Sequence, residues 1–171
     1  LSSTCSITGT PTSVTAQAAY TITATNTGGT ASQVLTLTVT DALPVIAYSG
    51  SPFTFTKGTS VGTISATSTG GTVTACSVSP ALPAGLTLSS TCAITGTPTI
   101  ITTATSYTVT ATNSGGSASV AISVTVNDLV PVLSYTGSPF SWSRNSTITT
   151  LTPTNSGGSI TACSVRVTPM P

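Results

Sequence analysis

The sequence predicts an all-β protein made of tandem antiparallel β-sandwich repeats, each 87 residues long. Three observations lead to this fold class. The chain repeats itself at a fixed offset, its composition favours strands throughout, and turn signals recur about every ten residues. No segment shows the 3.6-residue apolar period of a helix.

The composition is rich in hydroxyl groups and poor in charge. Thr and Ser make up about two-fifths of the chain, and Thr favours strands much as Val does. The net charge is +1, which provides neither the basic footprint of a nucleic-acid-binding protein nor a polybasic patch for anionic lipid. No apolar run approaches the roughly 20 residues that span a bilayer. The charged residues are Asp41, Lys57, Asp128, Arg144 and Arg166.

The internal repeat has an offset of 87 residues. Residues 1–78 match residues 88–165 without a gap, and 41 of these 78 positions are identical. Identity at this level over such a length indicates a tandem array of one structural unit.

The phase of the repeat predicts where the units begin and end. Asp41 and Asp128 each follow an apolar alternating stretch and stand three residues before a proline, so we expect a joint between units at each. One complete unit then spans residues 42–128, residues 1–41 form the C-terminal half of a unit, and residues 129–171 form the N-terminal half of another.

Half units cannot bury their own cores, and three explanations are open at this point. The chain is an excerpt of a longer polypeptide, or a subunit whose halves are completed by neighbouring chains, or a chain whose two halves close on each other. We place the excerpt first, completion by neighbouring chains second and closure within one chain third.

The first half of the complete unit contains four predicted strands. Residues 44–48 and 52–56 are short strands separated by a Ser-Gly-Ser-Pro turn. Residues 60–67 alternate in polarity, and residues 72–78 form a returning strand. The pair Gly70 and Gly71 between them predicts a tight hairpin turn.

The second half begins after a turn at residues 80–85 and contains two short strands, 86–88 and 93–95. Residues 106–113 then alternate cleanly, with Tyr107, Val109 and Ala111 on one face. Gly115 and Gly116 turn the chain. The inward positions expected on the last strand are Val120, Ile122, Val124 and Val126.

Seven or eight short strands in fewer than 90 residues indicate a sandwich. A parallel β-solenoid is the alternative, but its repeats are far shorter than 87 residues.

Three elements together resemble a known family. They are Leu-Pro-Ala-Gly-Leu-Thr-Leu at 82–88, Ile-Thr-Gly-Thr-Pro at 94–98 and the Tyr-containing strand at 107–113. This combination resembles the Ig-like repeats of bacterial surface proteins, which are related to the cadherin-like domain of dystroglycan. The resemblance implies tandem Ig-like antiparallel sandwiches in an exported, adhesive or fibrous protein. The chain departs from the pattern in its cysteines and in its tail at 166–171.

The four cysteines predict one disulfide within the unit and two incomplete ones. Cys76 and Cys92 flank one turn of the complete unit, 16 residues apart, and their bond is expected to contribute about 3 kcal/mol. Cys163 occupies the Cys76 position of the next unit and Cys5 the Cys92 position of the preceding one. Their partners are therefore expected in neighbouring half units or chains. Such bonds would place the protein in an oxidising compartment.

Catalysis, metal and cofactor binding are not expected. His and Glu are absent, and the two aspartates occupy equivalent joints 87 residues apart, so they do not form a catalytic pair. Without His, the cysteine spacing does not suit a zinc site, and one carboxylate per joint is too few for calcium. The aromatic residues Phe53, Phe55, Phe140 and Trp142 are interpreted as packing groups rather than as a carbohydrate platform.

The sequence therefore predicts a non-enzymatic structural module. We expect it to form part of an extracellular bacterial fibre, stalk or sheath at the cell surface, with copies of itself as partners in a head-to-tail array. An adhesin module that binds a host protein or glycan is the alternative. An accessory domain of a secreted enzyme is a third class, which would need a catalytic domain outside this sequence.

Overall fold

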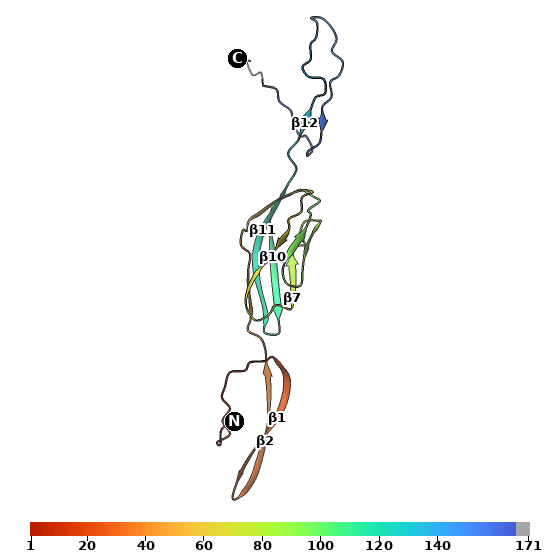
Figure 1. Cartoon of the computed structure of the whole chain (residues 1–171). Coiled ribbons are helices and arrows are strands. Elements are labelled where there is room, and N and C mark those ends of the chain that lie inside the picture. The colour runs from red at the N-terminus through yellow and green to blue at the C-terminus, as the bar shows by residue number, and fades with distance from the viewer. Residues whose placement is uncertain (167–171) are drawn as a thin grey trace.

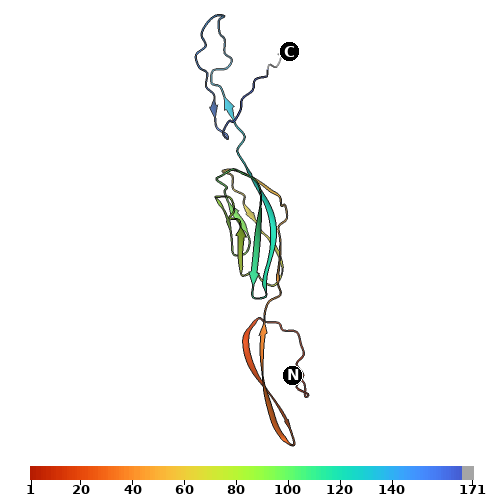
Figure 2. The same ribbon diagram turned by 180° about the vertical axis from the view of Figure 1, so that it is seen from behind.

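The structure is a computed structural model, and it describes residues 1–166; residues 167–171, most of the divergent tail noted above, lie outside the described part. Three portions follow one another along a line, with the central portion between the N-terminal and C-terminal ones (Figures 1 and 2). The N-terminal portion contains the hairpin of β1 (Thr15–Asn26) and β2 (Gly29–Val39), and the C-terminal portion contains the short pair β12 (Leu133–Ser134) and β13 (Thr154–Asn155).

The central portion is a β-sandwich. One layer is the four-stranded sheet β4-β11-β10-β7, and the other consists of the pair β3-β6 and the three-stranded sheet β5-β9-β8. The strands are β3 (Pro44–Ala47), β4 (Phe53–Thr56), β5 (Thr63–Ile64), β6 (Thr67–Gly70), β7 (Ala75–Ser79), β8 (Leu86–Leu88), β9 (Ile94–Gly96), β10 (Thr102–Asn113) and β11 (Gly116–Asn127).

The core lies between these layers and follows the predicted alternation. Tyr107, Val109 and Ala111 of β10 are buried, and so are the alternate residues of β11 from Ile122 to Val126. They pack against Ile46 of β3 and Ile94 of β9. Burying a Val or Ile side chain contributes about 1.5–3 kcal/mol relative to leaving it exposed, so this cluster holds the two layers together. The predicted all-β Ig-like sandwich is confirmed.

Three details differ from the predictions. Gly70 and Gly71 do not close a hairpin, because β6 pairs with β3 in one layer whereas β7 pairs with β10 in the other. The chain crosses between the layers here, and the strand expected at 60–67 is reduced to the two residues of β5. The sandwich is also not wholly antiparallel, since β4 runs parallel to β11.

Tyr48 links the core to the turn that carries Cys92. Its hydroxyl donates a hydrogen bond of 2.5 Å to the Cys92 carbonyl oxygen, and its ring meets that of Phe53 edge to face. Burial raises the pKa of Tyr48 above the ordinary value of 10.0, because the phenolate would lose solvation there.

Replacing Tyr48 with Phe is expected to lower the free energy of unfolding by about 1 kcal/mol at neutral pH, because the Cys92 carbonyl loses its donor. The native chain should also lose stability as the pH rises past about 10, since its unfolded state releases the Tyr48 proton first. The difference between the two chains should therefore narrow at high pH. Urea unfolding of both chains, at neutral pH and above about pH 10, measures this difference in unfolding free energy. Tyr135→Phe, at the equivalent exposed position, is the control and should leave stability unchanged.

Candidate functional site

The first candidate site is the cysteine pair of the central sandwich. A disulfide joins Cys76 of β7 to Cys92, with their Cα atoms 5.3 Å apart. Cys92 lies in the turn between β8 and β9 and is fully buried. The bond therefore ties the edge of the four-stranded sheet to the opposite layer.

The turn around Cys5 repeats the turn around Cys92. Cys5 has a φ of 62° and Cys92 a φ of 61°, both in the left-handed region. The amide of Cys5 donates to the Ser2 carbonyl, just as that of Cys92 donates to Ser89, at 3.0 Å in both. The N-terminal turn thus has the conformation of the disulfide-bonded turn although Cys5 is a free thiol.

Cys163, the second free cysteine, is exposed in the C-terminal portion. Cys5 and Cys163 belong to portions at opposite ends of the molecule (Figure 1), so the structure does not bring these two thiols together.

The second candidate site is the joint at residues 41–43, which enters the central sandwich before β3. Four glycines from two separate turns face this segment: Gly70, Gly71, Gly115 and Gly116. A Cβ atom on any of the first three would overlap a backbone carbonyl oxygen of the joint, and one on Gly116 would meet the Leu43 side chain. We call this arrangement the glycine clasp. Only glycine allows so close an approach of three backbone segments.

Polar contacts fix the joint within the clasp. Asn113, which is only 7% exposed, donates from Nδ2 to the Ala42 carbonyl at 2.8 Å and accepts at Oδ1 from the Gly115 amide. The Ser114 hydroxyl donates to Asp41 Oδ2 at 2.9 Å and accepts from the Asp41 amide at 3.0 Å. The joint is therefore held by both its backbone and its carboxylate.

The joint at residues 128–130 has half of such a clasp. Gly157 and Gly158 face the carbonyl oxygens of Val130 and Leu129, as Gly70 and Gly71 face those of Leu43 and Ala42. The Asp128 carboxylate accepts from the amides of Leu129 at 2.9 Å and Ser159 at 3.3 Å. Among residues 1–166, no second glycine turn faces this joint.

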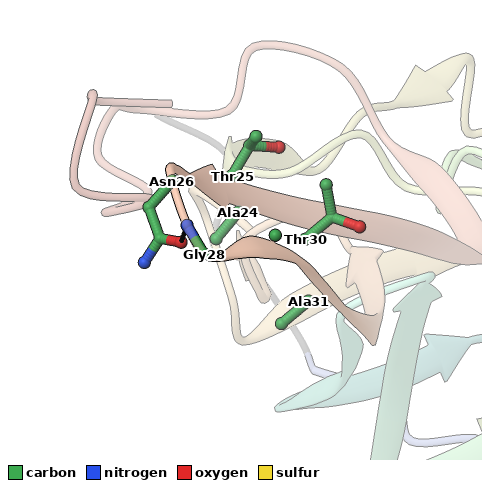
Figure 3. A pocket seen from close by; sticks show the side chains of 7 residues that line it. Ala24, Thr25, Asn26, Gly28, Thr30 and Ala31 are labelled. Carbon is green, nitrogen blue, oxygen red and sulfur yellow. Dashed lines mark hydrogen bonds between the residues drawn. The ribbon is translucent and has the colours of Figure 1, made fainter.

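The tip of the N-terminal hairpin corresponds to the other half of the clasp, the turn at Gly115 and Gly116, but among the described residues no joint segment lies against it. A surface hollow of about 530 Å³ lies at this tip. Figure 3 shows the side chains that line it. The Gly28 amide donates to Asn26 Oδ1 at 2.8 Å, as Gly115 does to Asn113, and no atom outside the turn lies within 4 Å of a Cβ on Gly29. The lining residues are Ala24, Thr25, Asn26, Gly28, Gly29, Thr30 and Ala31.

Both terminal portions expose the residues that the central sandwich buries. Tyr20 is 46% exposed whereas its equivalent Tyr107 is 4% exposed, and Leu133 is 47% exposed whereas its equivalent Ile46 is 7% exposed. Further exposed apolar residues of these portions are Ile7, Val34, Leu37, Tyr135, Trp142, Ile148, Leu151 and Ile160.

Other site chemistry is sparse in the part of the chain that the structure covers. There, no three His, Cys, Asp or Glu residues gather where they could hold a metal ion. Within the same residues, no helix is long and apolar enough to cross a membrane. Phe53 and Phe55 stack with 5.9 Å between ring centroids and pack against the core, as predicted for packing groups.

Comparison with protein families gives one match. The family model described as "Putative Ig domain" matches residues 41–127, which is just over half of the chain and includes the whole central sandwich. The chain belongs to this Ig domain family. Ig-like domains of this kind are generally non-enzymatic and are typical of extracellular and surface proteins. No curated protein matches the chain in sequence.

Solved structures similar to this Ig-domain chain include three multidomain proteins. Extracellular domains 3–5 of Drosophila OTK match with a TM-score of 0.42 and 15% identity over 65% of the chain. A chimeric titin Z1Z2 tandem matches with a TM-score of 0.37 and 21% identity over 65% of the chain. Sidekick-1 immunoglobulin domains 1–5 match with a TM-score of 0.36 and 24% identity over 64% of the chain. The chain spans 40%, 65% and 25% of the lengths of these structures.

Sequence reasoning missed the glycine clasp. It assigned Gly70 and Gly71 to a hairpin and gave Asn113 and Ser114 no role. A signal was present, because each Asp-x-x-Pro joint is followed by a Gly-Gly pair at the same distance, Gly70 and Gly157 being 87 residues apart. A repeat shows that such glycines correspond, but not which segments they contact.

Proposed function

We propose that the chain is a structural module of an extracellular bacterial fibre, stalk or sheath, built from Ig-like units stacked end to end. The observation that carries the proposal is the recurrence of one joint geometry. The joints at 41–43 and 128–130 make the same contacts with Gly70 and Gly71 and with Gly157 and Gly158, respectively. These contacts fix in the same way the point at which the chain enters each unit, which supports a regular spacing between units.

The contacts of the joint support stiffness rather than flexibility. A free linker of Gly and Ser behaves as a random coil, whereas the joint at Asp41 is bonded by Asn113 and Ser114. A disulfide in each unit would resist unfolding under load, and it agrees with export to an oxidising compartment. The low charge permits close packing between neighbouring modules.

Small-angle X-ray scattering of the chain at low concentration is expected to show an elongated particle with a single well-defined maximum dimension. A stiff joint predicts one such dimension, whereas a flexible joint predicts a broad distribution. A compact particle would contradict the proposal. Saturable binding to a glycan or a surface protein, with no rod or filament visible in electron micrographs, would instead favour an adhesin module.

A further inference from the structure

We infer that the central sandwich carries tension along the chain and that the parallel strands β4 and β11 are the element that resists it. The inference rests on the proposed structural function and adds a mechanical role to it. The pair β4–β11 holds the unit closed under load, and the disulfide between Cys76 and Cys92 limits how far the unit extends once this pair has opened.

The chain enters and leaves the central sandwich at opposite ends (Figure 1). The entry joint at 41–43 lies against the turn at Gly115, directly before the start of β11. The same strand ends at Asn127, next to the exit joint at 128–130. Its 12 residues therefore reach about 40 Å from one joint to the other. Tension in the chain pulls the two joints apart along the direction of β11.

Tension loads β4 and β11 in opposite directions. Through β3, β4 is connected to the entry joint and is drawn back toward it, whereas β11 leads into the exit joint and is drawn the other way. The two strands run parallel, with Phe53 opposite Val124 and Thr56 opposite Asn127, so they part by sliding along each other. The hydrogen bonds between them lie across the direction of sliding and therefore bear the load together rather than one after another.

The core also opposes this sliding. Phe53 and Phe55 of β4 stack with 5.9 Å between their ring centroids and pack against the buried cluster. A slip of one residue would turn both rings to the outer face of the sheet, because side chains alternate between the faces. The pair therefore cannot slip to a new register without pulling two aromatic rings out of the core.

Two further hydrogen bonds extend the pair. At its start the Ser123 amide donates to the Ser51 hydroxyl at 3.2 Å, and at its end the Lys57 amide donates to the Asn127 carbonyl at 2.9 Å. Alternate residues of a strand in a parallel ladder face the same neighbour. The amides of the two phenylalanines therefore face β11, as that of Lys57 does, whereas the amide of Thr54 faces away.

The strand β3 lies before β4 and takes the load first. It pairs with β6 of the same layer, from Pro44 opposite Gly70 to Ala47 opposite Thr67. Release of β3 alone frees the chain only as far as residue 52, since β4 is still paired with β11. The β4–β11 pair is therefore the contact that must open before tension reaches the rest of the core.

The disulfide acts after the pair has opened. Cys76 on β7 and Cys92 in the opposite layer are separated by 16 residues in the chain but only 5.3 Å between Cα atoms. Tension that reaches the bond from either side passes through it, so the segment between the two cysteines stays closed. At its full reach this segment would add about 50 Å to the length of the unfolded unit.

Single-molecule stretching of the full chain, held by peptide tags at its two ends, tests the role of the pair. Lys57→Pro removes the amide that donates to Asn127 and should raise the unfolding rate of the central sandwich at constant force by roughly tenfold. Thr54→Pro is the matched control, because it places proline in the same strand where the amide does not face β11. Its rate should change by less than about twofold.

Ile94→Val distinguishes resistance to force from equilibrium stability. Ile94 is buried on β9, and its truncation lowers equilibrium stability. The strand β9 is still in place when β4 detaches, so the unfolding rate under force should stay that of the native chain. An unchanged rate for Lys57→Pro, or equal acceleration by Ile94→Val or Thr54→Pro, would overturn the inference.

The same instrument tests the role of the disulfide. In the Cys76→Ala, Cys92→Ala chain, the gain in length on unfolding of the central sandwich should exceed that of the native chain by about 50 Å. Equal gains in the two chains would contradict this role. An elongated particle in X-ray scattering whose sandwich opens equally fast with and without Lys57→Pro would overturn this inference alone. A compact particle would instead contradict the proposed function, whatever the stretching result.

Discussion

Removing the internal disulfide with Cys76→Ala and Cys92→Ala is expected to lower the unfolding free energy of the central sandwich by about 3 kcal/mol. The bond closes a 16-residue span and connects the two layers. Its loss raises the conformational entropy of the unfolded chain and, in the folded state, releases the turn that holds Cys92 in the core. Alanine is preferred to serine because Cys92 is fully buried and a hydroxyl there would need a partner.

Urea unfolding followed by far-ultraviolet circular dichroism measures this loss. Fluorescence of the single tryptophan does not report it, because Trp142 lies outside the central sandwich. The matched control is Cys5→Ser with Cys163→Ser, which removes the free thiols and should leave the stability of the dilute chain unchanged. An equal loss in both double variants would show that the effect does not arise from the disulfide.

Gly115→Ala is expected to destabilise the central sandwich by about 1–3 kcal/mol and to loosen the joint. The new methyl group would overlap the Asp41 carbonyl oxygen, and the three atoms nearest to it, from Asp41 and Ala42, are all backbone atoms that cannot rotate away. The overlap is relieved only if the joint leaves the clasp, which also breaks the two hydrogen bonds between Ser114 and Asp41. Thermal unfolding gives the stability, and small-angle scattering should show a broader distribution of maximum dimensions.

Gly28→Ala is the control for this variant because it makes the same change in the equivalent turn of the N-terminal hairpin. There, the nearest atom to the added Cβ is Asn26 Oδ1 at 3.2 Å, and no joint segment is near. The dilute chain should therefore keep its stability and its dimensions. A similar loss in both variants would mean that alanine disfavours the turn itself, independently of the clasp.

The long strands were the most predictable part of the fold. On β10 and β11, apolar and polar residues alternate for many positions, and an alternating pattern leaves one choice of inward face. The crossing at Gly70 and Gly71 was not predictable in the same way. A Gly-Gly pair between two apolar stretches has the local signature of a hairpin, and only the pairing of β3 with β6 and of β7 with β10 makes it a crossing between layers.

The sequence by itself determined the 87-residue repeat, the strand-rich composition, the inward faces of the long strands and the equivalence of Cys5 to Cys92 and of Cys163 to Cys76. Each of these depends on spacing along the chain, which the sequence records directly. Only the tertiary structure showed that glycines from two distant turns clasp the joint at Asp41 and that the hairpin tip at Asn26 is the same clasp without its joint. The physical reason is that close backbone packing brings together segments more than 70 residues apart, and local sequence carries no record of such contacts.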